Sequence, residues 1–362
     1  MVVGIRYAAL RKQFGREDNE SKSEVSILNY GTSQMRLIPA LAEHMAYRIA
    51  GGDLIEKFLA AQSKMSDPKD ESVTELHALL SVLKPIMTGN SQFRLQGLRE
   101  MLGGHGYSRF AKMGDWRNGN DINITWEGDN TILIQQASKF IAKNLQKKMK
   151  GKEVKFKCMS FLKKFDDVST DKLPLENPKD LHDINNITAL MEFRVNILLQ
   201  KSVGRLAEKI GNKVNAFDAW NDTQSFYLQT MTKAFGELHT LNCFKEALEK
   251  LTESPTKKVL RDLMILFALV QLERDMVYLR EGDFITTEAC DMIRNEILEL
   301  NCSLKDHAIT IVDAIAPPDE VLGSALGHSD GKIFDRYLSK VFMHPGAFER
   351  ANWWELLHHK KI

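Results

Sequence analysis

The amino-acid sequence predicts an all-α protein that consists of two consecutive helical bundles. Apolar residues recur three and four positions apart over long stretches, which is the period of amphipathic helices. No stretch shows the alternation of apolar and polar residues that is typical of strands. The chain has 362 residues, which is longer than one average domain and therefore favours two domains.

The first bundle, predicted over residues 1–150, contains three amphipathic helices. Two of them include residue types that disfavour a helix interior. We expect Gly51-Gly52 to break the first helix and Pro85 to kink or interrupt the second. The three helices are predicted over residues 34–62, 72–102 and 130–149.

Residues 151–180 are predicted to form a linker. Lysines crowd its beginning, and Pro174 and Pro178 follow. A basic run can bind phosphate, but a solvated face or a linker explains such a run more often. Residues 181–362 are predicted to form the second helical domain, in which Pro317-Pro318 ends a helix.

Composition excludes several functional classes. A net charge of +1 argues against nucleic-acid binding, which requires a concentrated basic surface. No stretch of about 18 apolar residues is present, so we expect no membrane span. We also predict no metal site and no disulfide framework, because the four cysteines lack C-x-x-C spacing: Cys158, Cys243, Cys290 and Cys302.

Residues 103–130, between the second and third predicted helices, are rich in glycine, aromatic residues and acids. A long loop of this composition inside a helical domain is more often functional than not. Gly103, Gly104 and Gly106 would allow the backbone to approach a ligand closely or to adopt a positive φ. A helix C-cap followed by a turn explains the same glycines.

Glu127 lies just before Gly128 and Asp129, and Asp129 is the expected N-cap of the third helix. A carboxylate at this position is either a favourable partner of the helix dipole or a base at the mouth of a pocket. In the second case the neighbouring Trp126 would shield it from water. The spacing alone leaves both interpretations open.

Two motifs in this region resemble the signature of the acyl-CoA oxidases. They are Gly103-Gly104-His105-Gly106-Tyr107-Ser108 and Thr125-Trp126-Glu127-Gly128-Asp129-Asn130. Arg11-Lys12-Gln13-Phe14-Gly15 resembles the R-x-x-F-G element that these oxidases share with the acyl-CoA dehydrogenases.

Further matches support the same family. Glu75-Leu76-His77-Ala78-Leu79 followed by Lys84-Pro85 resembles the oxidase helix before the glycine motif. Asp115-Trp116-Arg117-Asn118 is similar to the loop of the branched-chain (pristanoyl) type. Residues 181–362 resemble the additional helical domain of the oxidases, with weaker motifs.

The resemblance implies a FAD-dependent oxidase of peroxisomal fatty-acid β-oxidation. Such an enzyme converts acyl-CoA and O₂ to trans-2-enoyl-CoA and H₂O₂. It implies that Glu127 is the base that removes the α-proton, and that the Glu127 main-chain N–H polarises the thioester carbonyl. No nucleic acid is implied as a partner.

The resemblance also implies a homodimer with FAD bridging the subunits. Arg11 would contact the FAD pyrophosphate across the dimer interface, since a guanidinium suits bidentate contact with phosphate. Phe14 would pack near the adenine, with a plain core position as the alternative. Gly103, Gly104 and Gly106 would let the backbone approach FAD. Asp129 and Asn130 would either contact the cofactor or cap the helix.

The sequence departs from the family pattern in three respects. Gly31 stands where members often carry a glutamine near the adenosine. The final residues, His359-Lys360-Lys361-Ile362, differ from a serine-lysine-leucine peroxisomal signal, although the resemblance implies a peroxisomal location. The chain begins almost at the R-x-x-F-G helix, so we expect the N-terminal helical and middle β domains of the family to be missing.

Two alternatives to the oxidase remain open from the sequence. One is a non-catalytic helical protein, derived from an oxidase, that acts by dimerisation. The other is an acyl-CoA dehydrogenase, which passes electrons to an electron-transfer flavoprotein rather than to O₂. The second helical domain and the Trp126-Glu127-Gly128-Asp129-Asn130 form favour the oxidase.

Overall fold

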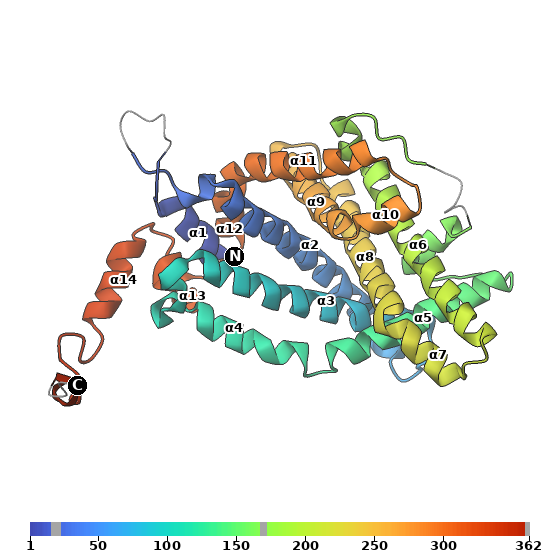
Figure 1. Ribbon diagram of the computed structural model, residues 1–362, viewed down its shortest axis with the longest axis horizontal. Helices are drawn as coiled ribbons and strands as arrows, with labels where there is room; N and C mark the ends of the chain where they lie inside the picture. The colour runs from blue at the N-terminus through green and yellow to red at the C-terminus, as the bar shows by residue number, and fades with distance from the viewer. Residues whose placement is uncertain (16–22, 167–171, 359–362) are drawn as a thin grey trace.

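The computed structural model describes residues 1–15, 23–166 and 172–358, and it confirms the all-α class (Figure 1). Within these ranges no strand is formed, and Lys12 and Ser26 make an isolated antiparallel bridge. No helix among the described residues is both long enough and apolar enough to cross a membrane. The tetrapeptide from His359 to Ile362, which differs from the peroxisomal signal, lies outside the described residues.

The α-helices vary in length, and α2 and α3 are the two longest, with 31 residues each. In chain order they are α1 (Val2–Leu10), α2 (Gly31–Ala61), α3 (Glu71–Met101), α4 (Met113–Asp121), α5 (Asn130–Met149), α6 (Ile184–Gly211), α7 (Ala216–Thr223), α8 (Gln229–Glu249), α9 (Pro255–Arg274), α10 (Met276–Glu281), α11 (Thr287–Leu304), α12 (Ala308–Ile315), α13 (Asp319–Leu322), α14 (Ile333–Phe342) and α15 (Trp354–His358).

Helix α2 lies at the centre of the packing. It contacts α3 from the first predicted bundle and α8, α9 and α11 from the second. Fully buried side chains from both parts belong to one apolar cluster, including Leu41, Leu79, Phe235 and Phe267. Burial of this apolar surface is the main favourable term in folding. A continuous core therefore joins the two predicted bundles, and their boundary stays a prediction.

The expected break at Gly51-Gly52 and the expected interruption at Pro85 are wrong, while the kink expected as the other outcome at Pro85 stays a prediction. Helix α2 continues through Gly51-Gly52, and α3 continues through Pro85. Relative to alanine, a glycine in a helix interior costs about 1 kcal/mol and a proline about 3 kcal/mol. Both helices offset these costs by burying apolar side chains on either side, such as Ala50 and Leu54 in α2 and Leu83 in α3.

Part of the predicted linker is packed into the protein. Lys157–Lys164 forms a 3₁₀ helix, and the side chains of Met159, Phe161 and Leu162 are buried in the core. The Asn196 side-chain amide of α6 donates to the Phe161 carbonyl at 3.0 Å. The basic run thus combines an apolar face in the core with lysines that remain at the surface.

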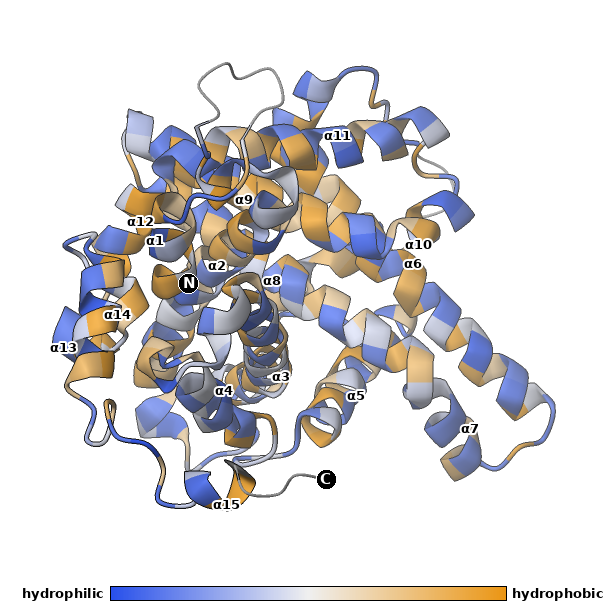
Figure 2. Ribbon diagram, turned by 60° about the vertical axis from the view of Figure 1, so that its left-hand side comes forward, coloured by the Kyte–Doolittle hydropathy of each residue, from blue (hydrophilic) through white to orange (hydrophobic). Residues whose placement is uncertain are grey.

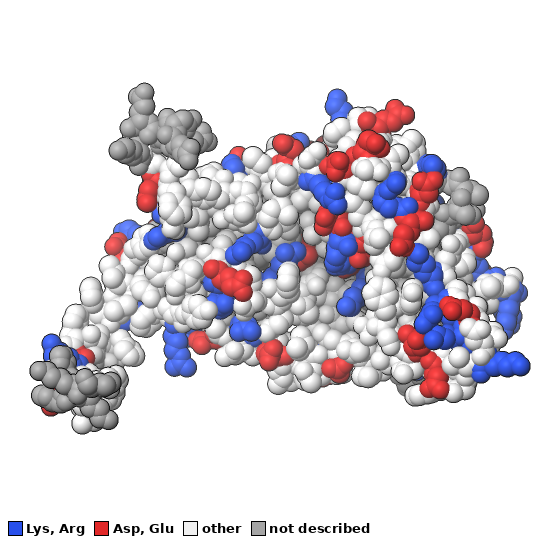
Figure 3. Space-filling view, viewed as in Figure 1, with Lys and Arg blue, Asp and Glu red and all other residues white. Residues whose placement is uncertain are grey.

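The distribution of charged side chains on the surface agrees with the near-zero net charge of the sequence. Positive and negative side chains are interspersed on the face drawn in Figure 3, where no large patch of one sign stands out. In Figure 2 the hydropathy colours show α4 as largely hydrophilic, whereas much of α9 is apolar. Helix α4 is therefore an outer helix, and it belongs to the segment that carries the predicted site.

Candidate functional site

Residues 103–130 form a series of short helices rather than the expected long loop. Three 3₁₀ helices and α4 occupy most of the segment: Gly103–Tyr107, Arg109–Ala111, α4 and Ile122–Ile124. The segment reverses direction after α3, and α4 packs along α3. Left-handed residues Gly103 (φ 58°) and Lys112 (φ 64°) lie within this reversal. The sequence did not reveal these helices because they are too short to show a periodic apolar face.

The returning segment brings Glu127 beside the middle of α3. Glu127 has a left-handed backbone with φ 56°, and its side chain is exposed. Such a conformation costs a residue with a Cβ roughly 1–2 kcal/mol. Gly128 follows at φ 100°, and a Cβ there would lie 2.8 Å from Leu133 Cδ2. Strained backbone of this kind is characteristic of functional sites.

Hydrogen bonds with α3 hold the residues that follow Glu127. Lys84 Nζ donates to the Gly128 carbonyl at 2.7 Å and to Asn130 Oδ1 at 2.8 Å. Asn130 Nδ2 donates to Thr88 Oγ1 at 3.0 Å and to the Pro85 carbonyl at 3.4 Å. Glu127 is therefore placed by a polar anchor on α3. Sequence reasoning assigned no role to Lys84, although it noted the Lys84-Pro85 pair.

Asp129 is the N-cap of α5, as predicted from its position. Its Oδ1 accepts from the backbone N–H groups of Thr131 and Ile132 at 2.9 and 3.3 Å. Beside it a hollow of about 510 Å³ is lined by residues that include Gly89, Phe93 and Thr125. A cofactor contact by Asp129 or Asn130 stays a prediction.

Trp126 does not shield Glu127 from water in this chain. Its indole is 51% exposed, and its Nε1 donates to Asn123 Oδ1 at 2.8 Å. No described residue accepts a hydrogen bond from the Glu127 N–H or pairs with its carboxylate. Both the N–H and the carboxylate of Glu127 are therefore available to a bound molecule.

Arg11 and Phe14 follow α1 on an extended segment. Phe14 has φ 56° and is 70% exposed, so the plain core position considered for it is wrong. Backbone hydrogen bonds to Val25 fix this segment, from Gln13 N–H to the Val25 carbonyl at 3.0 Å and from Val25 N–H to the Phe14 carbonyl at 2.9 Å. A hollow of about 410 Å³ adjoins Phe14, and Tyr30 and Arg36 also line it.

The glycine motif lies close to Arg11. Tyr7 of α1 shares a hydrogen bond with His105 Nδ1 at 3.0 Å. Burial, together with the positive charge of Arg11, lowers the pKa of His105 from its ordinary value. On its other side His105 meets Tyr337 of α14 edge-to-face, with ring centroids 5.1 Å apart. The structure thus brings Arg11 and the motif into one cluster.

The three glycines of the motif have different surroundings. A Cβ on Gly106 would lie 2.0 Å from the Arg99 carbonyl oxygen, so a glycine is required by contact with α3 itself. Gly103 has φ 58°, directly after the α3 C-cap. A Cβ on Gly104 would meet open space. A Cβ on Gly103 would also meet open space, but its positive φ already requires a glycine, so Gly104 is the glycine that neither packing nor backbone conformation explains.

The two groups of predicted site residues lie at different places along α3. The anchor for Glu127 includes Thr88, whereas the motif begins fifteen residues later at Gly103. At 1.5 Å of rise per residue this separation is about 22 Å along the helix axis. Within one chain, Glu127 is therefore not brought together with Arg11.

Comparison with known families identifies the chain. Residues 1–142 match the acyl-CoA oxidase C-alpha1 domain, and residues 183–362 match the acyl-CoA oxidase family model. The helical fold and both sequence matches place this chain in the acyl-CoA oxidase family.

The relatives are considerably longer than this chain. Human peroxisomal acyl-coenzyme A oxidase 3 is 31% identical over 366 residues, which cover 98% of this chain and 52% of that protein. Mouse peroxisomal acyl-coenzyme A oxidase 1 is 28% identical over 92% of this chain and 50% of its own length. The chain thus spans about half the length of the curated relatives it matches.

Solved structures share the fold. An acyl-CoA oxidase from tomato superposes with a TM-score of 0.91 at 22% identity, covering 98% of this chain and 53% of that one. Acyl-CoA oxidase-1 of Caenorhabditis elegans, complexed with FAD and ATP, gives 0.87 at 21% identity over 99% of this chain and 53% of its own.

Proposed function

We propose that this chain serves a FAD-dependent acyl-CoA oxidase of peroxisomal β-oxidation, which converts acyl-CoA and O₂ to trans-2-enoyl-CoA and H₂O₂. Family membership supports an oxidase that acts on acyl-CoA. The observation that carries the assignment is Glu127, an exposed carboxylate held on left-handed backbone by an anchor from α3. Left-handed backbone at a non-glycine residue is concentrated at functional sites, which agrees with this role for Glu127.

Glu127 is suited to the removal of an α-proton. Its carboxylate has no ionic partner among the described residues, so it is free to accept a proton from a substrate. Its N–H has no acceptor there either, and it would donate to the thioester carbonyl as negative charge develops on that oxygen. The Lys84–Asn130 anchor would keep both groups in place during the reaction.

The residues near α1 fit FAD. Phe14 presents an exposed ring beside a hollow, as required for packing against an adenine. Arg11 would bind the pyrophosphate through its guanidinium, and Gly104 leaves room for close approach. When bound, the flavin would accept the β-hydrogen as hydride and pass the electrons to O₂.

The separation along α3 supports a homodimer. Because Arg11 and Glu127 lie far apart in one chain, a second copy would bring its Arg11 and Phe14 to the cofactor that serves the first copy's Glu127. The other half of the relatives' length would contribute the rest of the pocket, including the part that selects the acyl chain.

The first test is the visible absorption spectrum of the purified chain with and without added FAD. A peroxide assay with palmitoyl-CoA and a branched acyl-CoA follows. Flavin bands and substrate-dependent peroxide are expected for an oxidase. Flavin reduction without peroxide would indicate a dehydrogenase. A colourless, inert chain that dimerises would favour the non-catalytic alternative, and the same assays would then be run on a longer form.

The first prediction concerns Glu127→Gln in the form of the protein that turns over. This variant retains the shape of the side chain and loses its basicity, so we expect bound FAD, no flavin reduction by acyl-CoA and no measurable loss of stability. Asp115→Asn is the matched control, since Asp115 is an exposed carboxylate in the same segment, paired with Lys112. Full turnover by Glu127→Gln would disprove the assignment of the base.

A further inference from the structure

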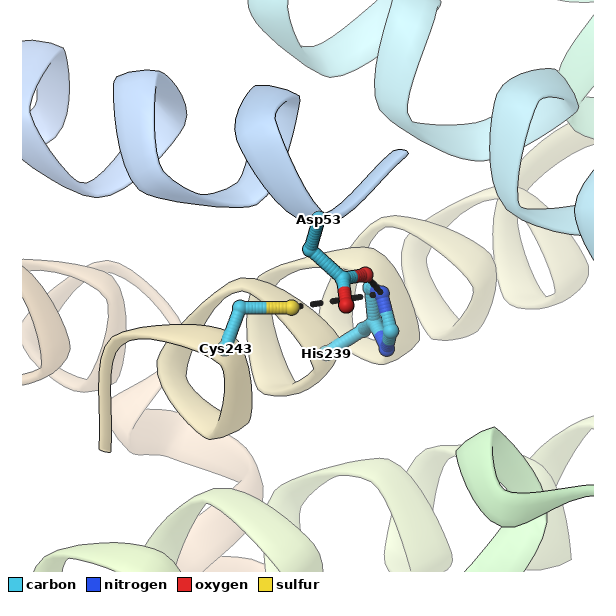
Figure 4. A group of neighbouring side chains, drawn as sticks. All are labelled: Asp53, His239 and Cys243. Atoms are coloured by element: carbon cyan, nitrogen blue, oxygen red, sulfur yellow. Dashed lines mark hydrogen bonds and ion pairs between the residues drawn. The ribbon is translucent and has the colours of Figure 1, made fainter. Parts of the chain in front are cut away.

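Away from the predicted site, three potential metal ligands from distant parts of the sequence converge between α2 and α8 (Figure 4). Asp53 comes from α2, whereas His239 and Cys243 lie one turn apart on α8. Their ligand atoms all lie within 4.8 Å of one another. His239 and Cys243 are 8% and 7% exposed, so both are buried. We infer that these three residues bind a zinc-class divalent metal ion.

The geometry is suited to a metal ion rather than to a catalytic triad. His239 Nε2 lies 3.5 Å from Cys243 Sγ and 3.6 Å from Asp53 Oδ2. The thiol and the carboxylate therefore approach the same ring nitrogen, whereas a proton relay requires one on each nitrogen. Cys243 is also buried, unlike the partially exposed cysteines that act as nucleophiles.

The two distances from His239 Nε2 match those between the ligands of tetrahedral zinc, and the third pair of ligand atoms lies within 4.8 Å. With Zn–N, Zn–O and Zn–S bonds of about 2.0–2.3 Å, neighbouring ligand atoms lie about 3.3–3.6 Å apart. The two contacts of His239 Nε2 are already at this separation. Three protein ligands of mixed N, O and S type leave the fourth position to water, as in open zinc sites.

Within the described part of the chain, one ligand atom lacks a hydrogen bond and makes only the 3.6 Å ionic contact with His239 Nε2. Asp53 Oδ2 is buried and has no hydrogen-bond partner among the described residues. The other oxygen, Oδ1, accepts a hydrogen bond from Lys57 Nζ at 2.6 Å. Buried polar atoms are normally hydrogen-bonded, so a buried carboxylate oxygen with only a long contact to the imidazole leaves a place for a cation among the three ligands. Through this hydrogen bond Lys57 would then orient the carboxylate toward the metal ion.

The surroundings are suited to a cation and give it access. The ligands line a cavity of about 300 Å³. Its lining carries more carboxylates than ammonium groups, and one of them, Glu192, is already paired with Lys164 outside the lining. The charged lining residues are Asp53, Lys57, Glu75, Lys157, Glu192, Lys245, Glu246 and Glu249. Coordination would release the Cys243 proton to solvent, because a metal-bound thiol ionises.

The test is a titration of the chelator-treated 362-residue chain with Zn²⁺ alone, followed by calorimetry. We expect one Zn²⁺ per chain, with binding weakened more than about 10-fold in Cys243→Ala and in Asp53→Asn. Cys302→Ala is the matched control, since Cys302 is an exposed cysteine outside the cavity, and it should bind Zn²⁺ like the wild type. Circular dichroism verifies that each variant is folded.

Co²⁺ provides a measurement that does not depend on any variant. Binding to the wild-type chain should produce a thiolate-to-cobalt charge-transfer absorption, and prior zinc loading should prevent it. The proposal would be overturned by a wild-type chain that takes up no Zn²⁺ at submillimolar concentration, by unchanged affinity in folded Cys243→Ala, or by a cobalt spectrum without the thiolate band. None of these readouts depends on oxidase activity.

Discussion

At the centre of the molecule three guanidinium groups and three carboxylates pair with one another, whereas Glu127 at the surface has no ionic partner among the described residues. Arg194 is fully buried and contacts both Glu237 and Asp275. Arg274 bonds to the same two acids. The network extends through Gln271 to Glu43, which holds Arg94 with two hydrogen bonds of 2.8 Å.

The two regions differ in what their polar groups do. Buried charges are tolerated only when they are paired and hydrogen-bonded, and the central network satisfies this requirement with groups of the chain itself. Phe14 and Glu127 instead combine exposure with left-handed backbone. The network serves folding and the packing of α2, α3, α6, α8 and α9, whereas the surface segments are available for a ligand or a second copy.

The largest effect is expected for Arg194→Ala, which tests whether the central network stabilises the fold. The substitution leaves Glu237 and Asp275 facing each other with less compensation in the core, so we expect a loss of about 3–5 kcal/mol in the free energy of unfolding. Chemical denaturation followed by circular dichroism measures it. Arg205→Ala is the control, because Arg205 pairs with Asp222 at the surface and its loss should be much smaller. Equal effects of the two variants would contradict the contrast.

A second comparison lies within the glycine motif. Gly106→Ala forces a Cβ against the Arg99 carbonyl, and overpacking of this kind costs about 1–3 kcal/mol. Gly104→Ala meets open space and should leave stability near that of the wild type. The same denaturation experiment distinguishes them. If Gly104→Ala were as unstable as Gly106→Ala, Gly104 would be a structural glycine rather than one that leaves room for a ligand.

The smallest expected effect concerns His105. Burial and the charge of Arg11 lower the pKa of His105 below its ordinary 6.5. Because the folded state then holds fewer protons than the unfolded state, His105 makes stability fall as the pH decreases through 6.5 towards the lowered pKa.

Arg11→Gln tests this placement. Removal of the positive charge should raise the pKa of His105 towards its ordinary value, while burial keeps it lowered. Titration of the histidine NMR signals measures the change. His44 is an internal control, since burial, the N-terminus and Arg48 lower its pKa. An unchanged His105 would mean that Arg11 does not act on the glycine motif.

Sequence periodicity predicted the long helices well. The stretches 34–62, 72–102 and 130–149 correspond to α2, α3 and α5, and Asp129 was recognised as a cap from local pattern alone. The continuity of α2 through Gly51-Gly52 was missed because burial against several other helices outweighs local propensity. Local sequence pattern reflects only residues that are close in the chain. The continuity of α2 depends instead on contacts with helices that are distant in sequence.

Motif resemblance selected the candidate site residues, whose roles stay predictions, but it did not indicate how they are arranged in space. Motif resemblance selected Glu127 and Arg11, whereas the Lys84–Asn130 anchor depends on contact between residues 46 positions apart. Asp53 and His239 are still farther apart in sequence. The sequence signal for the proposed metal site was a pair of possible ligands one helical turn apart, His239 and Cys243. It was missed because the prediction of no metal site considered only C-x-x-C spacing.

Helix α3 sets the distance between the Glu127 region, which would serve one site of the proposed dimer, and the glycine motif near Arg11, which would serve the other site. Deleting one residue between Thr88 and Gly103 would shift the glycine motif by about 1.5 Å and rotate it by about 100° around the axis relative to Asn130. An insertion of four residues would nearly restore the face while lengthening the spacing by about 6 Å. Changes in length within this span should therefore alter the alignment of a bridging cofactor far more than substitutions on the same exposed surface.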